Sequence, residues 1–231
     1  MDHTSRAFDD ELLGLTSRIQ EMGDLARHLF ENAITALRTG DVSLGQRAVH
    51  QDLSIDQMQI EIEDLAILII ARRQPVASDL RHVIACMRMA SDLERVGDLA
   101  KSIAARVTSE NNALSQMAIS SSLKRLAAAV QKQLSRVLIA FDRLDAEAAE
   151  AVRLGDVKID ELYNALFREL LTYMMEDARS IGQCTNLLFC AKNLERIGDH
   201  ATNLAENIQY ALTGRQPLAA RPKGDTVTGL P

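Results

Sequence analysis

Apolar residues recur in steps of three and four along almost the whole chain. In the first such segment, about residues 8–38, the apolar stripe consists of Leu12, Leu15, Ile19, Met22, Ala26, Leu29, Ala33 and Leu37. This spacing places the side chains on one face of an α-helix. Gly40 follows the segment and predicts its end, because glycine is favoured just past a helix C-terminus.

The same periodicity predicts five further helices, over about residues 42–73, 76–107, 115–143, 146–176 and 181–213. Pro75 separates the second from the third, since the residue before a proline disfavours helix and proline suits a first helical turn. Residues 109–112 form a polar linker by composition. Residues 214–231 hold three of the four prolines and little apolar content, which predicts a disordered tail.

The second half of the chain repeats the plan of the first. Asp41 matches Asp145, and Asp52 matches Asp156, each 104 positions later. The offset is 101 in the last segment of each half, and a three-residue deletion near residues 74–79 accounts for the change. We therefore predict an all-α fold of two repeated three-helix bundles, six long helices related by pseudo-twofold symmetry, with bundles at residues 1–108 and 113–213.

A nine-residue block is the most informative motif of the repeat. It reads DLERVGDLA at residues 92–100 and NLERIGDHA at residues 193–201, so each copy places a Glu and an Asp four positions apart. On one helix face such carboxylates repel by about 0.2–0.5 kcal/mol, and the internal glycine costs about 1 kcal/mol relative to alanine. Both costs occur twice, which predicts that a positive charge offsets the acids. A cation is the simplest candidate.

Oxygen-bearing side chains near the two blocks form the predicted metal site. Asn203 lies one helical turn beyond Asp199. The second helix of each bundle also carries an acid at the same position of the repeat, Asp56 in the first half and Asp160 in the second. The candidate ligands are Glu94, Asp98, Glu195, Asp199, Asn203, Asp56 and Asp160, with Asp52 and Asp156 as weaker candidates. Carboxylate and amide oxygens suit Mg²⁺, Ca²⁺ or Mn²⁺, and carboxylates also hold iron.

Two other interpretations of the block remain open at this point. The acids could form a polar contact between helices, or they could form a plain solvated face. The glycines, Gly97 and Gly198, have a packing explanation, because another helix can approach closely where there is no Cβ. Arg95 and Arg196 could pair with acids on another helix or bind an anion.

Composition narrows the class of protein. The chain of 231 residues is 47% hydrophobic with a net charge of −6, and the acidic balance argues against nucleic-acid binding. We expect a protein without a signal peptide or membrane span, in the cytoplasm, with its three cysteines as reduced core residues. A phosphate-binding glycine loop, a GxSxG motif and paired ExxH motifs are missing from the sequence, which argues against the enzymes that use them.

The repeated LERVGD and LERIGD blocks, together with residues 74–81 and 193–203, resemble the PhoU family over about residues 8–213. The resemblance implies a six-helix cytoplasmic regulator that is not an enzyme. It implies contact with the phosphate ABC transporter ATPase and with a phosphate-sensing histidine kinase, with the membrane reached only through these partners. Such proteins limit phosphate uptake and hold the phosphate-starvation response off when phosphate is plentiful.

The same resemblance implies a homodimer and a metal role for the acids. Some relatives bind iron or zinc clusters, or other divalent cations, through this motif, so Fe, Zn, Mg, Mn or Ca are the cofactors to expect. Glu94, Asp98, Glu195 and Asp199 match the family motif directly, and Asn203 matches its extension. Ser102 departs from it, which predicts a weaker first site. A metal-dependent phosphohydrolase and a metal-buffer protein are the alternatives.

Overall fold

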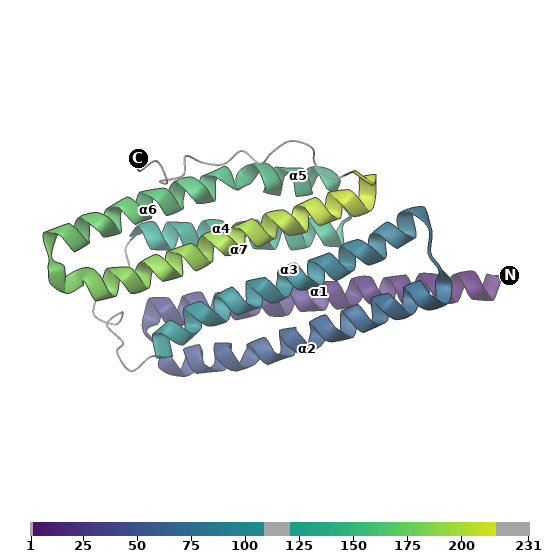
Figure 1. Cartoon of the computed structure of the whole chain (residues 1–231), viewed down its shortest axis with the longest axis horizontal. Coiled ribbons are helices and arrows are strands. Elements are labelled where there is room, and N and C mark those ends of the chain that lie inside the picture. The colour runs from purple at the N-terminus through teal and green to yellow at the C-terminus, as the bar shows by residue number, and fades with distance from the viewer. Residues whose placement is uncertain (1, 109–120, 216–231) are drawn as a thin grey trace.

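A computed structural model describes residues 2–108 and 121–215, with side chains from residue 6 onward, and this part of the chain is helical without strands. The helices are α1 (Asp2–Thr39), α2 (Val42–Arg73), α3 (Ala77–Thr108), α4 (Ser121–Asp142), α5 (Ala146–Gly155), α6 (Val157–Glu176) and α7 (Ile181–Thr213). Helices α1–α3 form one half of an elongated molecule, and α4–α7 form the other (Figure 1). The predicted linker at 109–112, the predicted start of the fourth helix at 115, and residues 216–231 of the tail predicted from residue 214 lie outside the described residues.

The predicted six-helix plan is confirmed, with one local difference in the fifth helix. Its two parts, α5 and α6, meet at Asp156. The carbonyl oxygen of Asp156 accepts a hydrogen bond from the amide of Ile159 at 2.8 Å, the tighter spacing of a 3₁₀ turn. Gly155, a poor helix former, directly precedes the junction.

Helix ends are set by the same residue types in both halves. The carboxylate of Asp41 accepts a hydrogen bond from the amide of Leu44, and that of Asp145 accepts one from the amide of Ala148, each at 2.9 Å. These are N-caps, each satisfying an amide that has no partner within its helix. Gly40 follows α1 with a φ of 69°, which confirms the predicted C-terminal stop.

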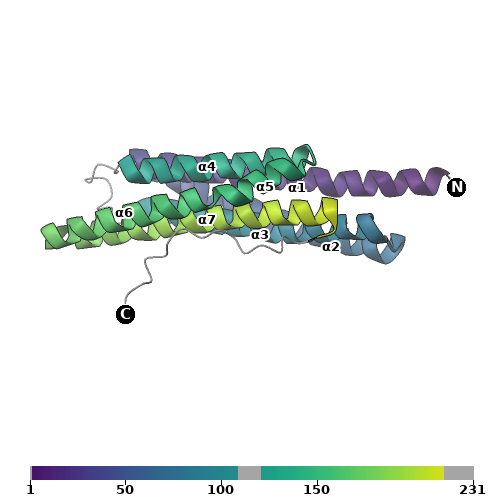
Figure 2. The ribbon, with the colours of Figure 1, turned by 90° about the horizontal axis from the view of Figure 1, so that it is seen from above.

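The core is continuous across the two halves. The predicted stripe of α1 from Leu15 to Leu37 is at most 4% exposed at each of its apolar positions, and the three cysteines are free and buried. Helices α3 and α7 lie side by side in the middle of the molecule, and α1 and α4 share one side of it (Figures 1 and 2). A Cβ on Gly23 of α1 would lie 2.5 Å from Cδ2 of Leu138 of α4. The glycine therefore lets α4 pack directly on α1.

None of the described helices is long and apolar enough to cross a membrane.

Candidate functional site

Both copies of the repeated block lie near the middle of a central helix and pack against the second long helix of their own half. A Cβ on Gly97 of α3 would lie 3.0 Å from Cδ1 of Ile55 and 3.1 Å from Oδ1 of Asp52. A Cβ on Gly198 of α7 would lie 3.0 Å from Cδ1 of Ile159. These contacts confirm the packing interpretation of the glycines. The close approach brings one buried aspartate of the neighbouring helix or helix junction against each block.

The first acidic cluster comprises Asp52, Asp56, Glu94 and Asp98. The ammonium of Lys101 donates to Oδ2 of Asp52 and, at 3.2 Å, to Oδ1 of Asp98. The chain itself therefore supplies positive charge to this cluster. Sequence reasoning missed Lys101, although its position three residues after Asp98 on the same helix face was a signal.

Arg95 adds a second positive charge at the edge of the first acidic cluster. Its guanidinium lies 3.3 Å from Oε2 of Glu94 and 3.2 Å from Oδ2 of Asp98. Both partners lie on its own helix, and not on another helix as the sequence had suggested. The arginine is more than half exposed, so its contribution to stability is small.

Negative charge in the first acidic cluster is only partly offset. Burial, and then the charge of Asp98, raise the pKa of Glu94. Burial likewise raises the pKa of Asp52, against the lowering effect of Lys101. Oδ1 of Asp52 is buried and has no hydrogen-bond partner among the residues that the structure describes. The cluster therefore holds its acids at a cost in free energy, which a bound cation would lower.

The second acidic cluster comprises Asp156, Asp160, Glu195 and Asp199. The ammonium of Lys192 lies 2.7 Å from the Glu195 carboxylate and 5.4 Å from the centre of the Tyr163 ring. Burial is the main cause of a raised pKa at Glu195, and Lys192 opposes it. The first half has Ser91 at the position of Lys192, so this cation is specific to the second half.

Buried Asp156 accepts a hydrogen bond from a neutral amide. The amide of Gln133 in α4 donates to Oδ1 of Asp156 at 3.3 Å and to Oγ1 of Thr202 at 3.1 Å. Gln133 and Thr202 are both buried. Sequence reasoning missed Gln133, and the signal was a glutamine on the otherwise apolar face of α4.

Asn203 and His200 form a contact between the two halves. Oδ1 of Asp92 in α3 lies 2.9 Å from Nδ1 of His200 and accepts a hydrogen bond from Nδ2 of Asn203 at 3.0 Å. Nδ2 of Asn207 donates to the other oxygen of Asp92 at 3.2 Å. The structure thus places the amide nitrogen of Asn203, predicted as a metal ligand, against an acid of the first half. The signal for this contact was the difference between the two blocks at their first position, Asp92 against Asn193.

Metal binding stays a prediction. The carboxylate oxygens of both clusters are suitable donors for a hard cation, and Oδ1 of Asp52 is left without a partner. Within residues 2–108 and 121–215, no group of three or more His, Cys, Asp or Glu side chains is arranged to hold an ion. The acids as placed offer at most part of a coordination sphere, which water would have to complete.

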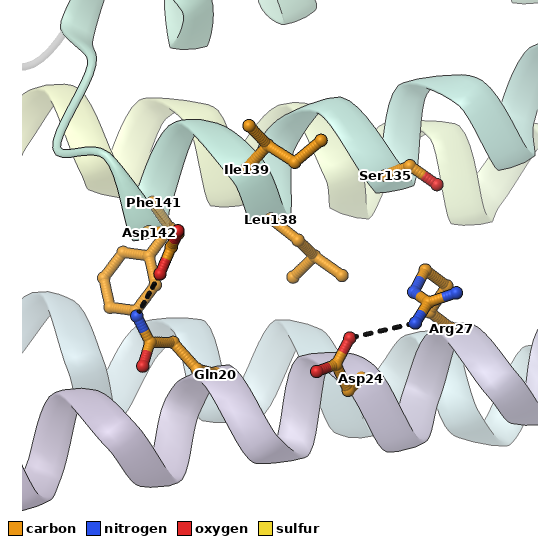
Figure 3. A pocket seen from close by; sticks show the side chains of 8 residues that line it. All are labelled: Gln20, Asp24, Arg27, Ser135, Leu138, Ile139, Phe141 and Asp142. Atoms are coloured by element: carbon orange, nitrogen blue, oxygen red, sulfur yellow. Dashed lines mark hydrogen bonds and ion pairs between the residues drawn. The ribbon is translucent and has the colours of Figure 1, made fainter.

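A large groove lies elsewhere, between α1 and α4, with a volume of about 500 Å³ (Figure 3). Four of its polar side chains form two interacting pairs. Gln20 donates to Asp142 at 2.8 Å, and Arg27 pairs with Asp24 at 3.1 Å. No member of either acidic cluster lines this groove. It is therefore a gap at the contact of the two halves, with its charges already satisfied.

The family of this chain is shown by a family model that matches it twice. The model of the PhoU domain matches residues 19–107 and 123–208, one match in each half. This chain belongs to the PhoU family. The resemblance found in the repeated block is thereby confirmed, and the two halves of the structure are the two PhoU repeats.

Named relatives of this PhoU-family chain are similar over nearly its full length. It is 47% identical to the phosphate-specific transport system accessory protein PhoU homolog of Rhizobium meliloti, covering 99% of this chain and 96% of that protein. It is 36% identical to the phosphate-specific transport system accessory protein PhoU of Escherichia coli, covering 92% of this chain and 88% of that one.

Two crystal structures share the fold. PhoU from Pseudomonas aeruginosa superposes with a TM-score of 0.82 at 36% identity, covering 90% of this chain and all of that one. The phosphate transport system regulatory protein PhoU from Streptococcus pneumoniae gives 0.83 at 32% identity, with 91% and 99% covered. The all-α architecture is therefore that of the PhoU proteins.

Proposed function

We propose that this chain is a negative regulator of the phosphate-starvation response. In this proposal it associates with the phosphate ABC transporter, including its ATPase, and conveys the transporter's state to a phosphate-sensing histidine kinase. The observation that carries the proposal is the similarity, over nearly the whole chain, to proteins named as accessory or regulatory proteins of phosphate transport. Its output is contact with other proteins rather than turnover of a substrate.

An exposed apolar row on α2 supports a function through protein contacts. Leu53, Ile60 and Ile67 follow one another at intervals of seven residues and are 68%, 55% and 56% exposed. Residues seven apart share one face of a helix, so these side chains form one row on the outside of the first half. An exposed apolar row of this kind is typical of a surface that another chain covers.

A deletion strain tests the proposed regulation. In high phosphate, loss of the gene should derepress a phosphate-starvation reporter and raise uptake of radiolabelled phosphate, and the intact gene should restore both. Ile60→Asp, which puts a charge in the exposed row, should restore them poorly. Ser54→Asp adds the same charge to an exposed polar position of α2 and is the matched control. A deletion strain that keeps full repression in high phosphate would refute the assignment.

We also propose that the first acidic cluster binds a divalent cation or iron. The unpartnered Oδ1 of Asp52 and the raised pKa of Glu94 support this, because both report negative charge that the chain does not fully offset. Small divalent cations are commonly held by one or two carboxylates and water. This proposal is independent of the regulatory one.

Elemental analysis of purified protein tests the cation proposal. A Glu94→Ala/Asp98→Ala variant should contain less metal than the wild type. The Glu195→Ala/Asp199→Ala variant makes the matched change in the second half. Metal content that neither variant alters would exclude both clusters. Turnover of a phosphate monoester by the metal-loaded wild type, lost in the same variant, would favour the phosphohydrolase alternative.

A further inference from the structure

A second groove, of about 240 Å³, lies between α4 and the junction of α5 with α6. Three cationic side chains line it: Lys132 and Arg136, one turn apart on α4, and Lys158 from the start of α6. Among the described residues, no Asp or Glu lines it. The chain as a whole carries a net charge of −6, so a groove with three cations and no acid runs against the overall charge.

Within the described part of the chain, the three cations have no partner. Lys132, Arg136 and Lys158 are all exposed, and none forms an ion pair or a hydrogen bond with another of the described residues. In the larger groove, by contrast, Arg27 pairs with Asp24. Three like charges around one groove repel, and an anion between them would convert that repulsion into attraction.

The corresponding place in the first half is closed by a hydrogen bond. At the repeat offset of 104, Asn32 stands where the second half has Arg136, and Gln51 stands where it has Gly155. Nδ2 of Asn32 donates to Oε1 of Gln51 at 3.1 Å. Around Gly155 nothing lies within 4 Å of where a Cβ would be. The second half therefore differs from the first in having both the cations and the space.

Apart from the three cations, the described residues that line the groove are neutral. Gln133 lines the groove, and its amide donates to the buried carboxylate of Asp156 at 3.3 Å. Ala129, Ala151 and Val152 complete much of the wall. Small apolar walls with cations at the rim suit a compact ligand whose charge is concentrated on oxygen atoms.

We propose that this groove binds a small oxyanion of the phosphate type. A guanidinium presents paired N–H donors that match two oxygens of such an anion, and two ammonium groups add strong charge-assisted hydrogen bonds. The phosphate group is either free inorganic phosphate or part of a nucleotide. The site does not depend on the proposed regulatory function, which concerns protein partners and gene expression.

Calorimetric titration of the full chain with inorganic phosphate tests the site. Lys132→Gln/Arg136→Gln removes two of the three cations and should weaken binding at least about tenfold. Arg143→Gln/Arg168→Gln is the matched control, because it removes two exposed arginines, just after α4 and within α6, that do not line the groove. The control should stay within about twofold of the wild type, as expected if net charge contributes only weakly at physiological salt.

A second variant fills the groove without changing its charge. Gly155→Gln introduces the residue that stands at this place in the first half, and the position has a helical φ that accepts any side chain. It should abolish phosphate binding while leaving the thermal unfolding temperature at least as high as that of the wild type. If Gly155→Gln bound phosphate as tightly as the wild type, the proposal would be overturned. Phosphate would then be attracted only by the positive charge of the surface and not by the groove.

Parallel titration with ADP separates the two sources of the phosphate group. Tighter binding of inorganic phosphate identifies the free anion, whereas tighter binding of ADP, lost in the same two variants, identifies a nucleotide. Wild-type protein that binds neither probe at millimolar concentration would refute the site. Equal binding by wild type and Lys132→Gln/Arg136→Gln would refute it as well.

Discussion

The two acidic clusters contain equivalent sets of four acids, but their buried aspartates accept hydrogen bonds from different kinds of donor. In the first half, Asp52 accepts a hydrogen bond from the ammonium of Lys101. In the second half, Thr202 stands at the position of Lys101, and Asp156 accepts a hydrogen bond from the amide of Gln133 instead. The first half has Leu29 where the second has Gln133. The donor to Asp52 is therefore a charged ammonium, whereas Asp156 accepts from a neutral amide.

This difference shows what a buried carboxylate requires. Its oxygens need hydrogen-bond donors, because an unsatisfied buried acid is costly, but the donor need not carry a charge. The acids and the glycine next to them are common to both repeats, whereas the compensating donors are not. The two clusters should therefore respond differently to loss of their donors.

Removing Lys101 should have the largest effect. Lys101→Met leaves the carboxylate of Asp52, which is only 1% exposed, without its positive partner. Breaking a buried charge pair from one side costs about 3 kcal/mol or more, and we expect a loss of about 3 kcal/mol in the free energy of unfolding. Urea denaturation measures it. Adding Asp52→Asn should restore most of the loss, since the buried charge is then gone; an unchanged midpoint for Lys101→Met alone would contradict this account.

Removing Gln133 should cost less. Gln133→Leu makes the second half resemble the first at the position of Leu29 and deprives Asp156 of a neutral donor. The expected loss is about 1–2 kcal/mol, the usual range for a neutral hydrogen bond to a buried group. The same denaturation experiment gives the comparison. A loss larger than that of Lys101→Met would reverse our ranking of the two clusters.

The two glycines of the repeated blocks should differ by a smaller amount. A Cβ on Gly97 would meet both Ile55 and Oδ1 of Asp52 within 3.1 Å, whereas on Gly198 the nearest oxygen of Asp156 is 3.6 Å away. Alanine gains about 1 kcal/mol in helix propensity, and overpacking costs about 1–3 kcal/mol. We expect Gly97→Ala to destabilise by about 1 kcal/mol and Gly198→Ala to be close to neutral, as measured by thermal unfolding. Equal effects would show that Ile55 and Ile159 alone decide the cost.

The smallest expected effect is the dependence of stability on pH, which should have opposite signs for two glutamates. Burial raises the pKa of Glu94, so the carboxyl group binds a proton more tightly in the folded protein than in the unfolded chain. Stability therefore falls as pH rises from about 4.5 through the folded pKa. Hydrogen bonds from Arg153 and Gln209 lower the pKa of Glu150 to about 2, so its contribution is present above about 4.5 and is lost as pH falls toward 2.

Neutral substitutions separate these two contributions. At pH 7, Glu94→Gln should raise the unfolding temperature slightly, and Glu150→Gln should lower it. At pH 3 the effect of Glu150→Gln should shrink, while that of Glu94→Gln should vanish because the carboxyl is then protonated. A destabilising Glu94→Gln at pH 7 would mean that Arg95 stabilises the Glu94 carboxylate by more than burial destabilises it.

The helices, their ends, the repeat and the positions of the acids all follow from the order of the amino acids alone. These features are local: the 3.6-residue period marks the buried stripe of α1, and Asp41 and Asp145 each cap a helix through an amide three residues away. The glycines also indicated close packing before the partner helix was known. Residues 92–100 and 193–201 were sufficient to suggest the family, which the match to both halves confirmed.

Which groups bind the acids, and where a groove opens, depend on the packing of helices that are distant in the chain. Lys101 reaches Asp52 across 49 residues, Gln133 reaches Thr202 across 69, and Asn203 reaches Asp92 across 111. Such pairs depend on how whole helices pack, which the spacing along one helix does not encode. For the same reason, the groove beside Gly155 followed from an empty volume between three helices, and no local pattern of the sequence marks an empty volume.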